Sequence, residues 1–154
     1  MGVEEGIKFE DPLFEVCLKD DELGDPLIND NHITAVGWGT EQEISEMKEI
    51  TFKINQLLCD LFKDVGLILV DYKVEYGRSN ASLILGDEFT PDGCRIWDAE
   101  TGESLDKDRF RKDLGNIIEA YQEIAIRLGI IHEQSNIRPL KFTKPREENF
   151  KKQK

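Results

Sequence analysis

The chain has 154 residues, of which 39% are hydrophobic and 34% charged, and its formal charge is −12. This is the size and composition of one globular domain, and the acidity disfavours non-specific binding to nucleic acid or anionic membranes, which would repel it. No apolar run approaches the ~20 residues needed to cross a bilayer, and the amino terminus lacks the features of a secretory signal. Three widely spaced cysteines without a CxxC pair argue against disulfides and zinc, so we expect a cytoplasmic protein with free thiols.

Residues 13–19 form the first predicted element, a half-buried strand. Apolar and polar side chains alternate along it, with Phe14, Val16 and Leu18 on one face and Glu15, Cys17 and Lys19 on the other. Gly24 and Pro26 then predict a turn that contains Asp25. From residue types alone, the stretch after Leu18 is a polar loop.

A long helix is predicted to begin after Thr40. Thr40 and Glu43 have the spacing of a capping box, in which each side chain binds a free backbone amide at the helix start. Apolar residues then recur every three or four positions up to Gly66, at Ile44, Met47, Ile50, Ile54, Leu57, Leu58 and Leu61. This stripe predicts a core-facing helix.

The next segment has charged residues at every second position. A strand would place Asp71, Lys73 and Glu75 on one face, with Val70, Tyr72, Val74 and Tyr76 on the other. We therefore expect one face for chemistry and the other for packing.

A hairpin is predicted to follow. A turn within residues 78–81 would return Ser82–Leu85 as an antiparallel strand and set Glu75 opposite a residue between about 82 and 86. Asp87 would then lie close to Glu75, and two converging carboxylates repel each other unless a cation such as Mg²⁺ lies between them. The alternative is a solvent-facing hairpin whose charges only keep it soluble, and spacing alone leaves both open.

Two further elements carry candidate anion-binding groups. Residues 90–93, Thr-Pro-Asp-Gly, predict a tight turn that leads into Arg95. A second amphipathic helix is expected over residues 107–128, capped by Asp106, with Phe110, Leu114, Ile117, Ile118, Tyr121 and Leu128 inward. Lys107, Arg109 and Arg111 would crowd its amino terminus, where free amides favour anions. Alternatively, Arg109 and Arg111 form surface pairs with Asp108 and Asp113.

The charge distribution separates residues 132–154 from the rest. Seven of the 20 Lys and Arg residues lie after Ile131, which leaves 13 basic against 29 acidic residues over 1–131, a difference of −16. The last 23 residues have no helical or strand period, so we expect a polar basic tail that is flexible or draped over the acidic body.

Three segments together resemble the SAICAR synthetase family. They are VDYKVEYG from Val70, GDEFTPDGCRIWD from Gly86 and LDKDRFRKDLG from Leu105, and the similarity extends from GVEEG at Gly2 to RLG ending at Gly129. The family joins carboxyaminoimidazole ribonucleotide to L-aspartate and cleaves ATP. The resemblance implies an α+β fold for residues 1–131, the larger lobe of a two-lobed ATP-binding architecture, with an antiparallel-rich sheet packed by two long helices.

The resemblance also implies roles for individual residues. Lys19, Glu75 and Asp87 would bind the nucleotide, and Glu75 with Asp87 would hold Mg²⁺. Asp25, Arg95 and Arg111 would contact substrate. Lys73 would stabilise charge during phosphoryl transfer, and Asp71 or another nearby carboxylate would accept the proton of the aspartate amine.

One departure from the family is large. The family's chains begin with a further β-rich lobe that carries lysines over the ATP phosphates, and this lobe is expected before Gly2. We therefore expect half a site, to be completed by the missing lobe or by a homo-oligomer. The alternatives are a folded but inactive chain and a generic Mg-nucleotide-binding module.

Overall fold

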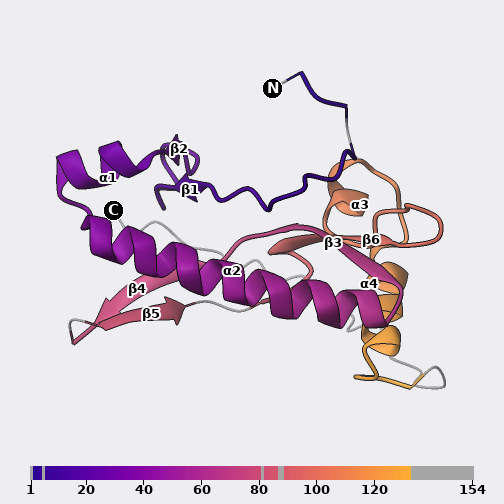
Figure 1. Cartoon of the computed structure of the whole chain (residues 1–154). Coiled ribbons are helices and arrows are strands. Elements are labelled where there is room, and N and C mark those ends of the chain that lie inside the picture. Colours follow the sequence, from indigo (N-terminus) through magenta and orange to yellow (C-terminus); the bar gives the residue numbers. More distant parts are fainter. Residues whose placement is uncertain (1, 5, 81, 87–88, 133–154) are drawn as a thin grey trace, which may run out of the picture.

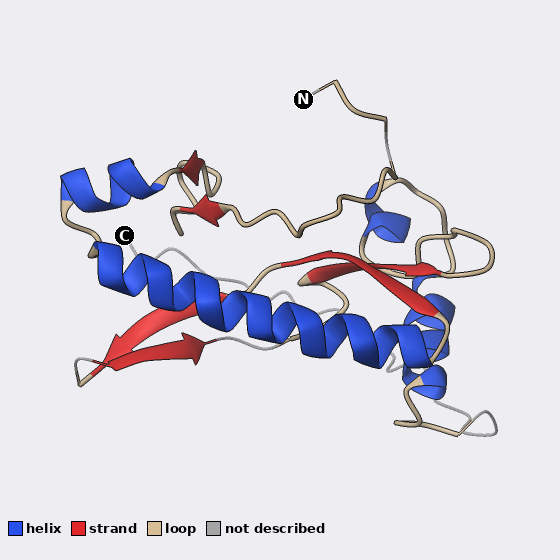
Figure 2. Ribbon diagram, viewed as in Figure 1, coloured by secondary structure: helices blue, strands red, loops and turns tan. Residues whose placement is uncertain are grey.

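The computed structural model describes residues 2–4, 6–80, 82–86 and 89–132, and Figures 1 and 2 show the arrangement of its helices and strands. In chain order the elements are β1 (Val16–Cys17), β2 (Leu27–Ile28), α1 (Asp30–Val36), α2 (Glu41–Asp64), β3 (Leu67–Tyr72), β4 (Glu75–Ser79), β5 (Ser82–Gly86), β6 (Cys94–Asp98), α3 (Asp108–Arg111) and α4 (Ile117–Arg127). The strands pair antiparallel as β1–β2, β3–β6 and β4–β5. The chain thus has the predicted α+β character, with three strand pairs within the described residues.

Helix α2 begins as the sequence predicts. The Thr40 hydroxyl accepts from the Glu43 amide at 3.2 Å, and the Glu43 carboxylate accepts from the Thr40 amide at 2.8 Å. Figure 1 shows α2 running along the molecule, with the β4–β5 hairpin and the β3–β6 pair toward opposite ends. The helix therefore connects both pairs.

The inward face of α2 differs from the predicted stripe. Ile44 and Phe62 are its buried residues, and they lie 18 positions apart, which is five turns at 3.6 residues per turn. Leu57 and Leu61 are 70% and 49% exposed because this phase turns them outward, so their predicted core position is wrong.

The core lies where α2, α4 and the β3–β6 pair meet. Its buried members are Phe62, Leu67, Cys94, Ile96, Leu105, Ala120 and Ile124. Full burial of a Leu, Ile or Phe side chain stabilises a fold by roughly 1.5–3 kcal/mol. The other face of β3 carries Ile68 and Val70, both more than 40% exposed.

The predicted second helix is two helices. Asp113, Gly115 and Asn116 have positive φ angles of 52°, 69° and 54°, which a continuous right-handed helix cannot contain. The break shifts the helical phase, so Phe110 at 77% and Ile118 at 54% are exposed. Ala120 and Ile124 supply the buried face of α4 in their place.

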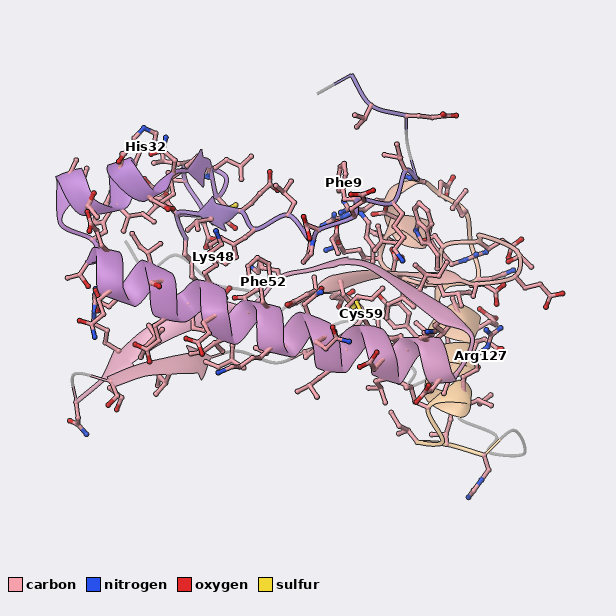
Figure 3. All side chains as sticks on the ribbon, in the orientation of Figure 1. Phe9, His32, Lys48, Phe52, Cys59 and Arg127 are labelled. Carbon is pink, nitrogen blue, oxygen red and sulfur yellow. The ribbon has the colours of Figure 1, made fainter. Side chains whose placement is uncertain are left out.

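The amino-terminal segment is attached to α2 by an aromatic and cationic contact. The Phe14 and Phe52 ring centroids lie 6.2 Å apart, and Lys48 Nζ lies 6.0 Å and 5.9 Å from the two rings. Figure 3 shows Lys48 and Phe52 on the side of α2 that faces β1. Burial alternates from Phe14 to Leu18 as predicted, although only Val16 and Cys17 pair as a strand.

None of the helices in the described residues combines the length and the apolar character that spanning a membrane requires. All three cysteines are free, as predicted.

Candidate functional site

The charged strand of the sequence is divided between two strand pairs. β3 ends at Tyr72, the Lys73 amide donates to the Gly93 carbonyl at 2.7 Å, and β4 begins at Glu75. Gly93 closes the predicted tight turn, since its amide donates to the Thr90 carbonyl at 2.9 Å. Lys73 therefore lies at the point where the chain changes its strand partner.

A β-bulge decides which face Asp71 occupies. Leu69 pairs with Ile96, and Asp71 pairs with Arg95, so Val70 is an additional residue in β3. Ile96 is buried in the core, and its neighbour Arg95 points to the opposite face. Because of the bulge, Asp71 lies beside Arg95 on this outer face. Without the bulge, Asp71 would lie on the core-facing side of β3 together with Leu69.

Tyr72 and Tyr76 pack against α2 as predicted, whereas the predicted packing position of Val70 is wrong, because the bulge leaves this side chain 41% exposed on the outer face. The Tyr72 hydroxyl donates to the Thr51 carbonyl of α2 at 2.6 Å. The ring centroids of Tyr72 and Phe89 lie 6.2 Å apart. The Tyr76 hydroxyl lies 2.8 Å from the Thr51 hydroxyl. Burial raises the pKa of Tyr72 to about 12, so this phenol stays protonated and structural.

Glu75 is the centre of a compact charged cluster. One carboxylate oxygen accepts from Lys19, which follows β1, and the other lies 3.0 Å from Lys73 Nζ. The Glu75 side chain is 22% exposed, whereas those of Lys19 and Lys73 are 72% and 60% exposed. Residues 56 positions apart are thus brought together at the surface.

These contacts keep the cluster charged. Hydrogen bonds from Lys19 and then Lys73 lower the pKa of Glu75. The Glu75 hydrogen bond raises the pKa of Lys73, and the nearby Asp25 charge acts in the same direction. A carboxylate between two ammonium groups can bind a hard cation. Its two lysines can also bind an anionic ligand in place of the carboxylate.

Asp25 lies in the loop between β1 and β2. Its φ angle is 51°, a conformation that aspartate tolerates better than most residues, and its carboxylate accepts from the Asp20 amide at 2.9 Å. The Asp25 amide donates back to the Asp20 carbonyl at 3.0 Å. The predicted turn therefore forms, and it holds Asp25 near enough to Lys73 to raise the pKa of the lysine.

Arg95 is held between two acids. Its Nη1 donates to Asp71, and its Nε donates to Asp108 Oδ2 at 3.1 Å. Burial alone would lower the pKa of Arg95, but the charges and hydrogen bonds of Asp71 and Asp108 outweigh it and raise the pKa. The Asp71–Arg95 pair joins two of the predicted site residues.

Asp106 and Asp108 were not predicted as parts of the site. Asp106 is fully buried, and its carboxylate accepts from the amides of Ile96 at 2.7 Å and Asp108 at 2.8 Å. The sequence feature that could have indicated them is the spacing of two aspartates, two residues apart, at the start of a short helix. Their partners on β6, Arg95 for Asp108 and the Ile96 amide for Asp106, lie ten or more residues away, so spacing alone could not identify them.

The expected anion site at the start of α3 does not form. The helix has only four residues, and the Asp106 carboxylate already binds the amide of Asp108. Arg109 donates to the carbonyls of Ser104 and Gly115, each at 2.9 Å, and is not paired with Asp113. Arg111 is exposed at the end of α3, one turn beyond Asp108.

Of the predicted metal ligands Glu75 and Asp87, only Glu75 lies within the described residues. Glu75 is opposite Gly86 in the hairpin, within the predicted range of 82 to 86, whereas Asp87 lies outside the described residues. In the described ranges, no group of three His, Cys, Asp or Glu side chains is arranged to hold a metal ion. Glu75 fits a single oxygen ligand, and a metal there would compete with Lys19 and Lys73 for its oxygens.

A surface depression of about 550 Å³ lies elsewhere. It is lined by Val65, Gly66, Asp98, Ala99, Glu100 and Arg127. None of these was a predicted site residue. Arg127 forms ion pairs with Asp98 and with Glu123, each at 2.7 Å.

Comparison with known proteins identifies relatives. The sequence profile of SAICAR synthetase matches residues 1–128. The phosphoribosylaminoimidazole-succinocarboxamide synthase of Pseudomonas putida (strain W619) is 56% identical over 130 residues, which cover 84% of this chain and 55% of that protein. The synthase of Idiomarina loihiensis is 58% identical with the same coverage. The chain thus spans about half the length of the curated relatives it matches.

Solved structures agree with this match. A SAICAR synthetase in complex with ADP aligns with a TM-score of 0.81 and 44% identity, covering 85% of this chain and 56% of that one. The enzyme from Pyrococcus horikoshii OT3 gives the same TM-score and identity, with 85% and 57% covered. Sequence and structure together show that this chain belongs to the SAICAR synthetase family.

Proposed function

We propose that this chain carries part of the active site of an ATP-dependent ligase of purine biosynthesis. The reaction joins L-aspartate to the carboxylate of carboxyaminoimidazole ribonucleotide and gives the succinocarboxamide. Family membership and a structural neighbour in complex with ADP support the proposal. The observation that carries it is the Lys19–Glu75–Lys73 cluster, which gathers charged groups from the β1–β2 region and the β3–β4 junction.

The nucleotide would bind at this cluster. Glu75, together with Asp87, would hold Mg²⁺, which supplies compensation for the charge that builds on the phosphoryl oxygens. Lys19 and Lys73 would leave Glu75 for the phosphates, because ammonium groups bind phosphate oxygens as readily as carboxylates. Transfer of the γ-phosphoryl group from ATP to the substrate carboxylate would give ADP and an acyl phosphate, from which the aspartate amine would displace phosphate to form the amide.

Substrate would be contacted by Asp25, Arg95 and Arg111. Asp25 is held by Asp20 near Lys73, and its carboxylate can accept a hydrogen bond from the amino group of the imidazole. Arg95 presents the planar fork that suits a carboxylate. Asp71 would accept the amine proton, or its ion pair with Arg95 would only orient that side chain.

The rest of the site would come from outside these residues. The chain corresponds to 55% of the length of its curated relatives, so we propose that the part it does not span, or a second copy of the chain, completes the nucleotide site. Three free thiols support the cytoplasm as the compartment, because secreted proteins of this size often form disulfides.

Calorimetry would test this function. Mg-ATP and carboxyaminoimidazole ribonucleotide are titrated into the chain alone and into the chain mixed with the complementary part of a relative. We expect binding only in the mixture. Glu75→Gln should weaken Mg-ATP binding by about tenfold or more, because charge-assisted contacts are lost. The matched control is Glu46→Gln on the exposed side of α2.

The outcomes separate the alternatives. Tight binding of unrelated nucleotides by the chain alone would indicate a generic Mg-nucleotide module. Absence of binding in both samples would indicate a folded chain without activity. Equal affinity in Glu75→Gln and in the unsubstituted chain would refute the role of the cluster.

A further inference from the structure

Arg95 is restrained from two directions. Its Nη1 is bonded to Asp71 on β3, and its Nε is bonded to Asp108 on α3 at 3.1 Å. The Asp108 side chain is only 9% exposed, whereas that of Asp71 is 49% exposed. Asp108 is therefore the more enclosed of the two acids that orient the guanidinium.

Asp108 is itself held in place by the buried Asp106. Its amide donates to Oδ1 of the buried Asp106, and Oδ2 of Asp106 accepts from the amide of Ile96, the residue next to Arg95. One carboxylate thus connects the start of α3 to β6 beside Arg95. Both of its oxygens are used in these backbone bonds, so the connection is rigid and specific.

Such restraint has a clear benefit for binding. A free arginine side chain loses rotamer entropy when a ligand immobilises it. A guanidinium that is already ordered has lost this entropy before the ligand arrives, and affinity rises accordingly. Arginine has five N–H donors, and among the described residues Asp71 and Asp108 take two of them.

We propose that Asp108 is a positioning residue that holds the Arg95 guanidinium ready for a substrate carboxylate, with Asp106 fixing Asp108 in place. This inference rests on the proposed role of Arg95 in substrate binding. Asp108 does not contact the substrate itself, and it acts through Arg95. Lys112, the residue that follows α3, also lies beside Asp108, with its Nζ 3.6 Å from Asp108 Oδ2.

The first test follows Arg95 directly. In the isotope-labelled chain, we expect slow hydrogen exchange at Arg95 Nε and restricted rotation of its guanidinium by nuclear magnetic resonance. Asp108→Asn should make the exchange faster and the rotation less restricted, because the charge-assisted bond is lost and the Asp71 pair alone remains, while Asp60→Asn, a matched exchange on α2, should leave both unchanged. A freely rotating Arg95 in the unsubstituted chain overturns the proposal without any variant, so the test stands even if Asp108→Asn fails to fold.

The second test measures binding of the imidazole ribonucleotide and L-aspartate in the form of the protein that binds Mg-ATP. Asp108→Asn should weaken carboxylate substrate binding by about tenfold and leave Mg-ATP affinity unchanged, because only the orientation of Arg95 is lost. Asp108→Glu, which keeps the charge, should recover part of the affinity. A merely structural role would lower the unfolding temperature and both affinities together.

Arg95→Ala separates this inference from the proposed function. If Arg95→Ala weakens substrate binding but Asp108→Asn does not, the positioning role is refuted and the function stands. If Arg95→Ala leaves substrate binding unchanged, the proposed role of Arg95 itself is refuted, and the positioning role is refuted with it.

Discussion

At the scale of residues, acids of this chain bind cations and backbone amides in definite combinations. Glu75 is held by two lysines, and Asp106 by two backbone amides. Asp98 combines both kinds of partner: its Oδ1 accepts from the Glu100 and Thr101 amides, and its Oδ2 pairs with Arg127 at 2.7 Å. The partners lie both near and far in sequence, so residue type alone indicates the charge but not the pairing.

Asp98 gives a prediction about pH. The Thr101 amide and then Arg127 lower its pKa from 3.8 to about 2. A carboxyl whose pKa is lowered by folding stabilises the fold above its unfolded pKa, and this contribution is lost as the pH falls from about 4 to about 2. The stability gap between the unsubstituted chain and Asp98→Asn should therefore shrink over that range, as urea unfolding at a series of pH values would show. A gap that stays constant would contradict the assignment, and Asp60→Asn serves as control.

At the scale of elements, the sequence predicts what is local. The capping box at Thr40, the turn at residues 90–93, the hairpin with Glu75 opposite Gly86 and the alternation from Phe14 to Leu18 are all confirmed. Each depends on residues within a few positions of one another, and therefore appears in the sequence.

The features that the sequence did not predict depend on distant partners. The bulge at Val70 exists because β3 pairs with β6, about 25 residues later. The break of the expected helix at residues 112–116 lets α4 place Ala120 and Ile124 in a core made by α2, β3 and β6. A hydrophobic period cannot reveal where such a break falls, so Phe110 and Ile118 were assigned to the wrong face. The functional roles of all the predicted site residues stay predictions: Lys19, Asp25, Asp71, Lys73, Glu75, Asp87, Arg95 and Arg111.

Helix α2 gives a prediction about stability. Thr40→Ala removes the hydroxyl that caps the Glu43 amide and should lower the free energy of unfolding by about 1 kcal/mol. The control is Ser45→Ala on the exposed side of the same helix, which should be neutral or slightly stabilising because alanine is the better helix former. Urea unfolding followed by circular dichroism measures both. Equal stability of the two variants would show that the capping bond contributes nothing.

At the scale of the whole molecule, charge is the dominant property. Residues 1–131 carry 29 acidic and 13 basic side chains, so like-charge repulsion acts across the body, while the Glu75 cluster brings two lysines together locally. A nucleotide that binds as proposed would therefore approach against the overall field, and a few local groups would hold it.

This imbalance predicts a stabilising effect of salt. Raising the ionic strength from about 0.01 M to about 0.15 M shortens the Debye length from ~30 Å to ~8 Å and should screen the repulsion. We expect the unfolding temperature to rise over this range when sodium chloride is added, measured by differential scanning calorimetry. A fall would mean that the surface ion pairs, such as Lys53–Glu49 at 2.7 Å, outweigh the repulsion.

The additional residue in β3 also determines how this strand can be compared with others. Two homologous strands, one with a counterpart of Val70 and one without, can be aligned only by opening a gap at that position. An ungapped alignment would match Asp71 with a core residue and Tyr72 with a solvent-facing one, and every assignment up to the end of the strand would be inverted. Insertions or deletions of a single residue between Leu69 and Asp71 therefore exchange polar and apolar positions, whereas changes of two residues preserve them.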